Sequence, residues 1–204
     1  MASRWSQRSK LNESRTFPVV NLCVNEFLYV DTHTVQVAGK NEEVFQMGKQ
    51  GTKIVGIDVK DLIKDLNKAY ADEWLAHYSY WYMARIVTGM GYEDMSEFLE
   101  KVAKDEEEHA GELADRIIEL GGLPIAHPME LEKNANYPYP KPPAGTSDYN
   151  KIIKLVTEAE AGAIDVYNKL AAKTMGKDHV TYQLICHILT EEVNHEEMFE
   201  DLLE

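Results

Sequence analysis

The stretch AKDEEEHAGELADRIIELGGLP, residues 103–124, places four consecutive acidic residues and then a histidine in the middle of a predicted helix. The helix is predicted from about residue 93 to residue 120, because apolar residues recur at helical spacing and Gly-Gly-x-Pro is typical of a helix end. The apolar stripe of this helix passes through Glu106 and His109. A glutamate and a histidine are unusual on an apolar stripe. The other predicted helices carry residues of the same kinds on their own stripes, and together they suggest an explanation.

The composition is typical of one globular domain with a core of its own. The chain has 204 residues, of which 44% are hydrophobic and 27% are charged. The formal net charge of −14 argues against a surface that wraps duplex DNA over the whole molecule, because like charges repel. The same charge is compatible with an acidic lining that attracts cations.

Neither the cysteines nor the apolar runs indicate an exported or membrane protein. Cys23 and Cys186 are too few for a disulfide framework or a four-ligand zinc site. The first residues, MASRWSQRSKLNESRTF, lack the apolar centre of a signal peptide, and no apolar run is long enough to span a bilayer. We therefore expect a cytoplasmic protein without membrane contact.

The chain divides into an N-terminal extension, residues 1–57, and a helical domain, residues 58–204. The extension begins with a locally basic arm and continues as a segment rich in β-branched and aromatic residues, which we expect to be extended or hairpin-like. The helical domain holds four long predicted helices, at about 58–88, 93–120, 148–174 and 178 to the C-terminus.

The connections between the predicted helices are short, long and short. Residues 125–147, IAHPMELEKNANYPYPKPPAGTS, are too rich in proline and polar residues to predict a regular element. Short loops join antiparallel neighbours, and one long crossover joins the two hairpins. The fold class predicted is all-α, a four-helix bundle with a long crossover between its second and third helices.

Each predicted helix has an apolar stripe on one face, and each stripe is interrupted near its middle by a glutamate. On two of the helices a histidine follows that glutamate three residues later. The stripes comprise Leu62, Leu66, Glu73, Tyr80 and Val87 on the first helix, Phe98, Val102, Glu106, His109, Leu113, Ile117 and Leu120 on the second, Ile153, Val156, Glu160, Ala163, Tyr167 and Leu170 on the third, and Ile185, Ile188, Glu192, His195, Phe199 and Leu202 on the fourth.

These interruptions predict a pair of metal ions in the bundle core. A carboxylate without a partner is costly in an apolar core, and no Lys or Arg lies on the stripes to pair with the glutamates. Carboxylate together with imidazole suits iron or manganese, and no thiolate is placed to favour zinc. We expect two iron ions, which manganese or zinc can replace in a crystal. The predicted ligands are Glu73, Glu106, His109, Glu160, Glu192 and His195.

Other polar residues near the ligands are assigned to their surroundings. Glu107 and Glu108 are expected to face solvent or a shell surface, and Glu158 and Glu191 lie off the stripes and are excluded as ligands. The alternative interpretation of the six predicted ligands is that they belong to a solvated acidic surface. Four residues are expected to support the ligands, with packing as the alternative role of the first two: Tyr80, His77, Asp105 and Tyr167.

The helical domain resembles the ferritin-like superfamily. The segments DEEEHAGELADRIIELGGLP and LTEEVNHEEMFEDLLE look like bacterioferritin, and they are most similar to the bacterioferritin-related, Dps-like proteins called thioferritins. The resemblance implies that the six predicted ligands hold two iron ions. It also implies oxidation of Fe(II) by peroxide or dioxygen, storage of Fe(III) in a hollow shell, and protection against oxidative stress.

Three departures from the family pattern refine these expectations. Bacterioferritins hold haem with a methionine directly after the ligand glutamate of the second helix, and Glu107 stands there, so no haem is expected. The chain ends just after the fourth helix, without the fifth helix of 24-meric ferritins, so a 12-mer is expected. The cysteine pair of the thioferritins is missing from the stretches NANYPYP and EAEAGAI.

Two other functions remain as alternatives. The same ligands suit an enzyme that disposes of peroxide without storage, as in rubrerythrin-like or manganese catalase-like proteins. A DNA-protecting Dps-type cage is the other, with the basic arm, residues 1–15, contacting phosphate.

For the iron site itself, we expect Glu73 and Glu160 to bridge the two ions and the histidines to be terminal ligands.

Overall fold

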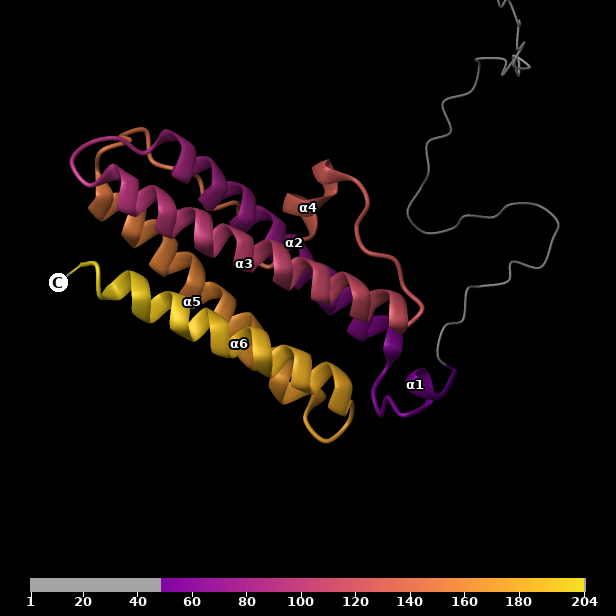
Figure 1. Cartoon of the computed structure of the whole chain (residues 1–204). Helices are drawn as coiled ribbons and strands as arrows, with labels where there is room; N and C mark the ends of the chain where they lie inside the picture. The colour runs from indigo at the N-terminus through magenta and orange to yellow at the C-terminus, as the bar shows by residue number, and fades with distance from the viewer. Residues whose placement is uncertain (1–48, 204) are drawn as a thin grey trace, which may run out of the picture. The chain divides into compact units, whose positions relative to one another are not determined.

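The computed structural model describes residues 49–203, and every regular element in this part of the chain is an α-helix (Figure 1). The predicted basic arm and extended segment lie outside the described residues. None of the described helices combines the length and apolar character needed to cross a lipid bilayer. The helices are α1 (Lys49–Lys53), α2 (Val59–Ile86), α3 (Tyr92–Glu119), α4 (Pro128–Asn134), α5 (Tyr149–Thr174) and α6 (His179–Glu200).

The four long helices form two antiparallel hairpins that lie side by side (Figure 1). A short turn joins α2 to α3, and Gly91 adopts a φ of +80° where α3 begins, a backbone conformation that favours glycine. A second short turn joins α5 to α6, and the long crossover between α3 and α5 connects the hairpins. The predicted four-helix bundle with its central crossover is therefore confirmed.

Aspartates begin three of the long helices. The side chain of Asp58 accepts a hydrogen bond from the backbone N–H of Asp61, as predicted for the first helix. Asp148 and Asp178 cap α5 and α6 in the same way. Each carboxylate satisfies backbone N–H groups that have no partner inside the helix, and this fixes where the helix starts.

The prediction of a crossover without regular structure was wrong, because it contains α4. His127 caps this short helix through Nδ1, which accepts from the N–H of Met129, and Pro128 occupies the first turn, where its missing N–H costs nothing. The segment MELEK between these signals favours a helix, but the surrounding prolines concealed it. Near the end of the N-terminal extension, α1 is a second short helix that the sequence analysis did not predict.

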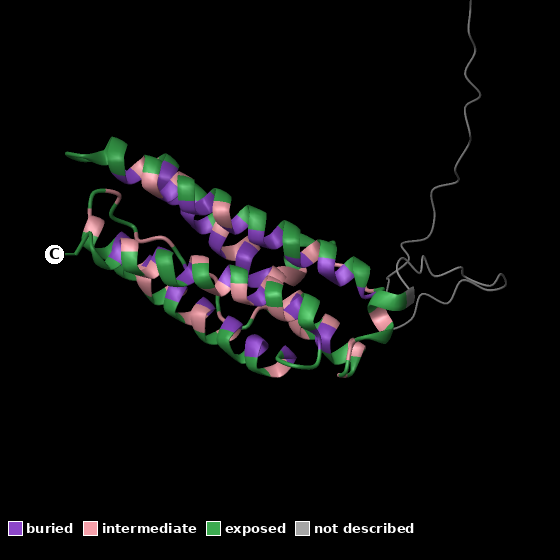
Figure 2. Cartoon of the chain, turned by 60° about the horizontal axis from the view of Figure 1, so that its bottom comes forward, coloured by how far each residue is buried: buried purple, intermediate pink, exposed green. Residues whose placement is uncertain are grey.

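A layer of buried polar side chains divides the apolar core into two clusters. One cluster includes Tyr80, Met83 and Phe199, and the other includes Leu66 and Ile188. Figure 2 shows the buried positions on the faces that the long helices turn toward one another. Leu202 was predicted to lie on a buried stripe, but the residue is 46% exposed. The reason is that α6 ends at Glu200, before this residue.

Replacing Arg116 with methionine should destabilise the bundle by about 3 kcal/mol, because it leaves the charge of Asp178 buried without a positively charged partner. Arg116 is 5% exposed, and its Nη2 lies 2.9 Å from Oδ2 of the fully buried Asp178 carboxylate. The free energy of unfolding in urea measures this loss. Arg85→Met is the matched control, because Arg85 pairs with Glu100 on the surface and should cost less than about 1 kcal/mol. Equal losses in both variants would contradict the expectation.

Candidate metal centre

The polar layer consists of the six predicted ligands, hereafter the six-residue centre. All four long helices contribute to it, and none of the six side chains is more than 4% exposed. The helical phase predicted from the stripes thus brings these residues together at one level of the bundle. The centre comprises Glu73 from α2, Glu106 and His109 from α3, Glu160 from α5, and Glu192 and His195 from α6.

The ligand atoms form two overlapping groups, each with its atoms within 4.8 Å of one another. Glu106 and Glu192 belong to both groups. The carboxylates that both groups share are therefore Glu106 and Glu192, whereas the sequence led us to expect that Glu73 and Glu160 would be shared. The reason is geometric: each shared glutamate lies one turn before its histidine, between the two imidazoles. The groups are Glu73, Glu106, His109 and Glu192, and Glu106, Glu160, Glu192 and His195.

Both imidazoles turn Nδ1 toward the centre and Nε2 away from it. Nδ1 of His109 lies 3.1 Å from Oε1 of Glu192, and its Nε2 lies 2.7 Å from Oε2 of Glu191. Nε2 of His195 similarly lies 3.2 Å from Oδ2 of Asp105. An outer carboxylate that accepts the Nε2 proton leaves the Nδ1 lone pair free for a metal ion and fixes the ring orientation.

Two buried tyrosines hold the unshared glutamates. The hydroxyl of Tyr80 donates to Oε1 of Glu160 at 2.6 Å, and the hydroxyl of Tyr167 donates to Oε1 of Glu73. Each tyrosine belongs to one hairpin and each glutamate to the other. The hydrogen bonds therefore cross between hairpins and restrain one oxygen of each carboxylate.

The centre has an approximate twofold repeat between the hairpins. In each hairpin, a glutamate on the first helix is followed seven residues later by a tyrosine, and the second helix carries the pattern acidic-Glu-x-x-His. The pairs related by the repeat are Glu73 and Glu160, Tyr80 and Tyr167, Asp105 and Glu191, Glu106 and Glu192, and His109 and His195. Each of the two overlapping groups therefore has the same composition, three glutamates and one histidine.

In the absence of metal, burial and neighbouring charges favour the protonated forms of Glu106 and His195. Burial, followed by the negative charges of Glu160 and Glu73, raises the pKa of Glu106 to about 8. Burial lowers the pKa of His195, but its contacts with the carboxylates of Glu106 and Glu160 outweigh burial and raise that pKa to about 10. A cation that binds between these groups replaces the protons that now reduce their repulsion.

Several buried atoms of the centre lack a hydrogen-bond partner among the described residues. Unpartnered polar atoms of this kind are rare in protein interiors, because each forfeits its hydration without compensation. Carboxylate oxygens and an imidazole nitrogen are the ligand atoms that iron and manganese prefer. The centre therefore fits a pair of such ions. The atoms without a hydrogen bond are Oε1 of Glu106, Oε2 of Glu160, Oε1 of Glu192 and Nδ1 of His195, and each lies 3.1–3.6 Å from an ion-pair partner inside the centre.

The structure separates the residues assigned to the surroundings. Asp105, Tyr80 and Tyr167 contact the centre, but Nδ1 of His77 lies 2.6 Å from the carbonyl oxygen of Ala103 and supports no ligand. His77 follows Glu73 by one turn, which directs its ring toward α3. Glu107, Glu108 and Glu158 are exposed as expected.

Glu191 was missed as a partner of the centre. It lies off the apolar stripe and was excluded as a ligand, yet its carboxylate holds His109. The signal that identifies it is the repeat itself, because Glu191 precedes Glu192 as Asp105 precedes Glu106. Glu191 is half-exposed because it lies off the stripe. From this position its carboxylate reaches the side of the His109 ring that faces away from the centre.

Removing the Glu191 carboxylate should weaken one metal position about tenfold, because the His109 ring loses the acceptor that fixes it. Anaerobic titration of Glu191→Ala with Co(II), followed by visible absorbance, distinguishes a position that keeps its affinity from one whose affinity has fallen. Glu197→Ala is the matched control, since Glu197 is also acidic and lies on α6 but has no contact with either histidine among the described residues. Two unchanged affinities in Glu191→Ala would contradict this role.

Comparisons with known proteins agree with this geometry. A family model described as a ferritin-like domain matches residues 63–204. The DNA protection during starvation protein of Pyrococcus furiosus is 37% identical over 151 residues, which make up 72% of this chain and 80% of that protein. Among solved structures, a dodecameric thioferritin, the bacterioferritin-related protein of Bacteroides fragilis, is 37% identical, with a TM-score of 0.73 over 76% of this chain and 93% of that one. A ferritin-like, diiron-carboxylate protein of Bacillus anthracis is 26% identical, with a TM-score of 0.61 over 72% of this chain and 98% of that one.

Proposed function

Because the chain belongs to the family of ferritin-like domains, we propose that it is a ferroxidase that oxidises Fe(II) at the six-residue centre and stores Fe(III) inside a shell of identical subunits. The observation that carries the proposal is the burial of six ligand-type side chains in two groups that share two carboxylates. Ions bound to shared carboxylates lie close enough together to react with one oxidant molecule. Iron is thus the substrate, and no haem takes part.

The residues of the centre have distinct roles in binding Fe(II). Glu106 and Glu192 bridge the two ions, and each remaining glutamate and histidine completes one position. The histidines bind through Nδ1, because an outer carboxylate holds each Nε2. Tyr80 and Tyr167 keep the unshared carboxylates in place from the opposite hairpin. The protein thereby fixes two ions before the oxidant arrives.

The oxidation takes two electrons, one from each Fe(II). With hydrogen peroxide, these electrons break the O–O bond, two protons are taken up, and two water molecules leave. With dioxygen, the same two electrons and two protons give hydrogen peroxide. Because both electrons are delivered at one centre, peroxide is not reduced by a single electron to the hydroxyl radical. This chemistry protects a cell against oxidative stress.

Storage requires a shell, and we propose a 12-mer. The Bacteroides fragilis thioferritin is described as dodecameric. It is 37% identical to this chain, and the match covers 76% of this chain. The formal net charge of −14 supports an acidic interior on which Fe(III) mineral begins to form.

Iron retention tests the storage function. Purified protein receives excess Fe(II) without oxygen, then peroxide, and is passed over a size-exclusion column with detection of iron, protein and particle mass. Storage predicts that iron elutes with a particle of twelve chains. Peroxide consumption without retained iron would contradict storage and favour the rubrerythrin-like or manganese catalase-like function.

DNA protection is a second candidate, favoured by the name of the Pyrococcus furiosus relative. The residues proposed to contact DNA are those of the basic arm, 1–15, which lie outside the described part of the chain. Retention of duplex DNA that weakens with salt and is lost on deletion of residues 1–15 would support this function. Equal retention with and without the arm would exclude the arm as the DNA contact.

A further inference from the structure

Part of the crossover is fastened to α2 beside the six-residue centre. Asp72, a buried residue directly before a ligand glutamate, accepts hydrogen bonds from the backbone N–H of Asn136 at 2.7 Å and from its Nδ2 at 2.5 Å. Two turns further along α2, the hydroxyl of Ser79 donates to the carbonyl oxygen of Pro140 at 2.5 Å. Residues 136–140, hereafter the strap, are therefore held on α2 at the level of the centre.

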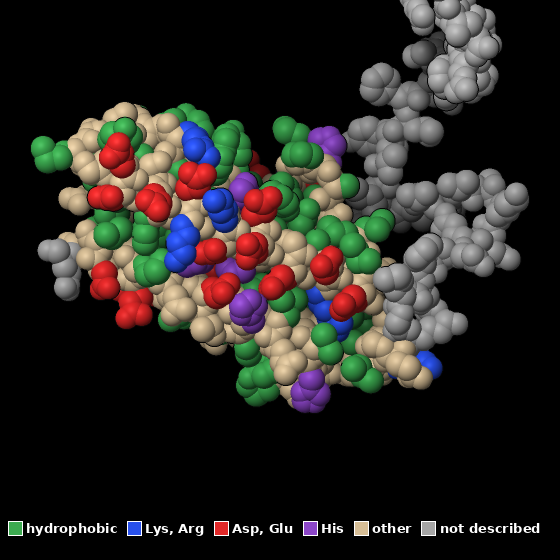
Figure 3. Space-filling model, viewed as in Figure 1, with side chains coloured by type: hydrophobic (Ala, Val, Ile, Leu, Met, Phe, Trp, Pro, Cys, Tyr) green, Lys and Arg blue, Asp and Glu red, His purple; other side chains and the backbone are tan. Residues whose placement is uncertain are grey.

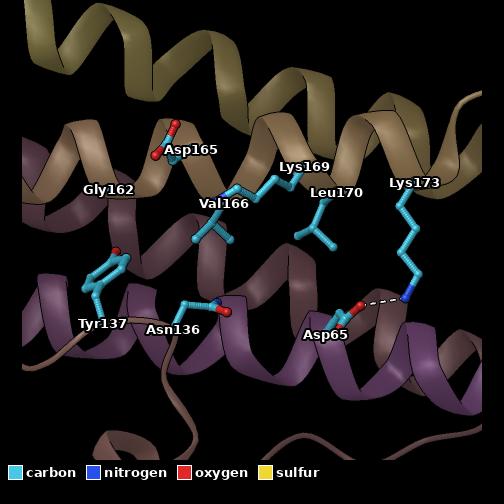
Figure 4. Close-up of a pocket in the computed structure, with 9 residues that line it drawn as sticks. All are labelled: Asp65, Asn136, Tyr137, Gly162, Asp165, Val166, Lys169, Leu170 and Lys173. Atoms are coloured by element: carbon cyan, nitrogen blue, oxygen red, sulfur yellow. Dashed lines mark hydrogen bonds and ion pairs between the residues drawn. The ribbon is translucent and has the colours of Figure 1, made fainter.

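The strap places Tyr137 between α2 and α5, with its ring directed toward α5 (Figure 4). The ring packs on Gly162, where an added Cβ would lie 3.6 Å from its Cδ1. Gly162 follows the ligand Glu160 by two residues. Burial, followed by the negative charges of Glu73 and Asp72, raises the pKa of Tyr137 well above its ordinary value. The hydrogen bonds of Asn136 to Asp72 and the contact of the ring with Gly162 place Tyr137 next to the segments that carry Glu73 and Glu160.

Tyr137 also lines a cavity of about 450 Å³ between α2 and α5. Two aspartates and two lysines line the same cavity, so its formal charges balance. One pair of them is joined directly, since Nζ of Lys173 lies 2.6 Å from Oδ2 of Asp65 (Figure 4). The other two charged residues are Asp165 and Lys169. A cavity without net charge has no preference for a cation over a neutral molecule.

The opposite side of the centre, between α3 and α6, is acidic. A cavity of about 510 Å³ there is lined by four carboxylates and one lysine, and His195 of the centre also lines it. Figure 3 shows acidic side chains with histidines among them along this face. A cavity dominated by one sign of charge concentrates ions of the opposite sign. Fe(II) is therefore drawn to this side. The charged residues are Asp105, Glu191, Glu197, Asp201 and Lys101.

We propose that Tyr137 is a gate through which the uncharged oxidant passes from the cavity between α2 and α5 to the six-residue centre, while Fe(II) arrives from the acidic side. Hydrogen peroxide and dioxygen are small and neutral, so they are not repelled by the lysines and need only a narrow opening. The ring of Tyr137 supplies that restriction because it lies against α5 at Gly162. This inference rests on the proposed ferroxidase function.

The size of the oxidant tests the gate. The full chain is loaded with Fe(II) without oxygen, and the initial oxidation rates with hydrogen peroxide and with tert-butyl hydroperoxide are compared. The bulkier oxidant accepts the same two electrons and two protons and gives tert-butanol and water. In Tyr137→Ala, the preference for hydrogen peroxide should fall about tenfold, whereas Tyr137→Phe should keep it, because it retains the ring. Gly162→Leu, which crowds the ring, should slow both oxidants.

Tyr139→Ala is the matched control, because Tyr139 lies in the same strap but its ring faces Tyr78 on α2, with centroids 6.4 Å apart. A fall in preference equal to that of Tyr137→Ala would indicate a loosened strap and would overturn the gate. An unchanged preference in Tyr137→Ala, together with unchanged oxidation rates for both oxidants in Gly162→Leu, would also overturn the gate. If the unaltered protein binds Fe(II) but does not oxidise it, the ferroxidase function itself fails, and the gate fails with it.

Discussion

Replacing Glu106 with alanine is expected to remove both metal ions from the centre, whereas replacing Glu73 with alanine is expected to remove one. Glu106 belongs to both ligand groups and Glu73 to only one. A position that loses its bridging carboxylate retains too few ligands and too little negative charge to hold an ion. The initial rate of Fe(II) oxidation by peroxide should fall about a thousandfold or more in Glu106→Ala, because both electrons must come from one site.

Anaerobic Co(II) titration gives the number of ions per chain for each variant, and stopped-flow absorbance gives the oxidation rate. Glu107→Ala is the matched control, since Glu107 is the next residue on α3 but is exposed. It should bind two ions and oxidise Fe(II) normally. If Glu106→Ala still bound two ions, or if Glu73→Ala bound none, the assignment of the bridging carboxylates would be wrong.

The second large effect concerns stability. Binding of two ions should raise the melting temperature of the metal-free protein by about 15 °C or more, since each site stabilises the fold by about 4 kcal/mol when the free ion is a thousandfold above its dissociation constant. Without metal, four carboxylates and two imidazoles are buried together, and several of their polar atoms make no hydrogen bond to the described residues. The ions remove that penalty in the folded state alone.

Differential scanning calorimetry with Zn(II) or Mn(II), and then with a chelator, measures this shift without redox chemistry. The double variant Glu106→Ala/Glu192→Ala serves as the reference that cannot bind, and its melting temperature should not respond to either ion. An equal response in the unaltered protein and in this variant would place the bound ions elsewhere on the molecule.

Most of the bundle and the composition of the centre could be predicted from sequence, because both depend on helical periodicity. A residue such as Glu160 stands out when the apolar positions three and four residues away predict a buried face. Burial of a charged residue on that face is then a chemical anomaly with few explanations. Because the two hairpins carry the same pattern of glutamates and histidine, the buried polar residues predicted in one hairpin support those predicted in the other.

Features that depend on how the hairpins meet could not be predicted in this way. The choice of bridging carboxylates requires the relative height of α3 and α6, which no single helix specifies. Glu191 lies off the stripe, and only its contact with His109 across helices reveals its role. Tyr137 lies in a proline-rich crossover, where periodicity carries no information and position depends on hydrogen bonds to Asp72.

The central claim is that the six-residue centre holds two Fe(II) ions per chain. Anaerobic titration of the purified full-length protein with Fe(II), followed by near-infrared circular dichroism, tests it most directly, because the bands of bound Fe(II) grow until the sites are filled. The account predicts saturation at two ions per chain in the unaltered protein and no bands in Glu106→Ala/Glu192→Ala. Bands that do not saturate, or that persist in the double variant, would mean that these buried glutamates and histidines are not a paired iron site.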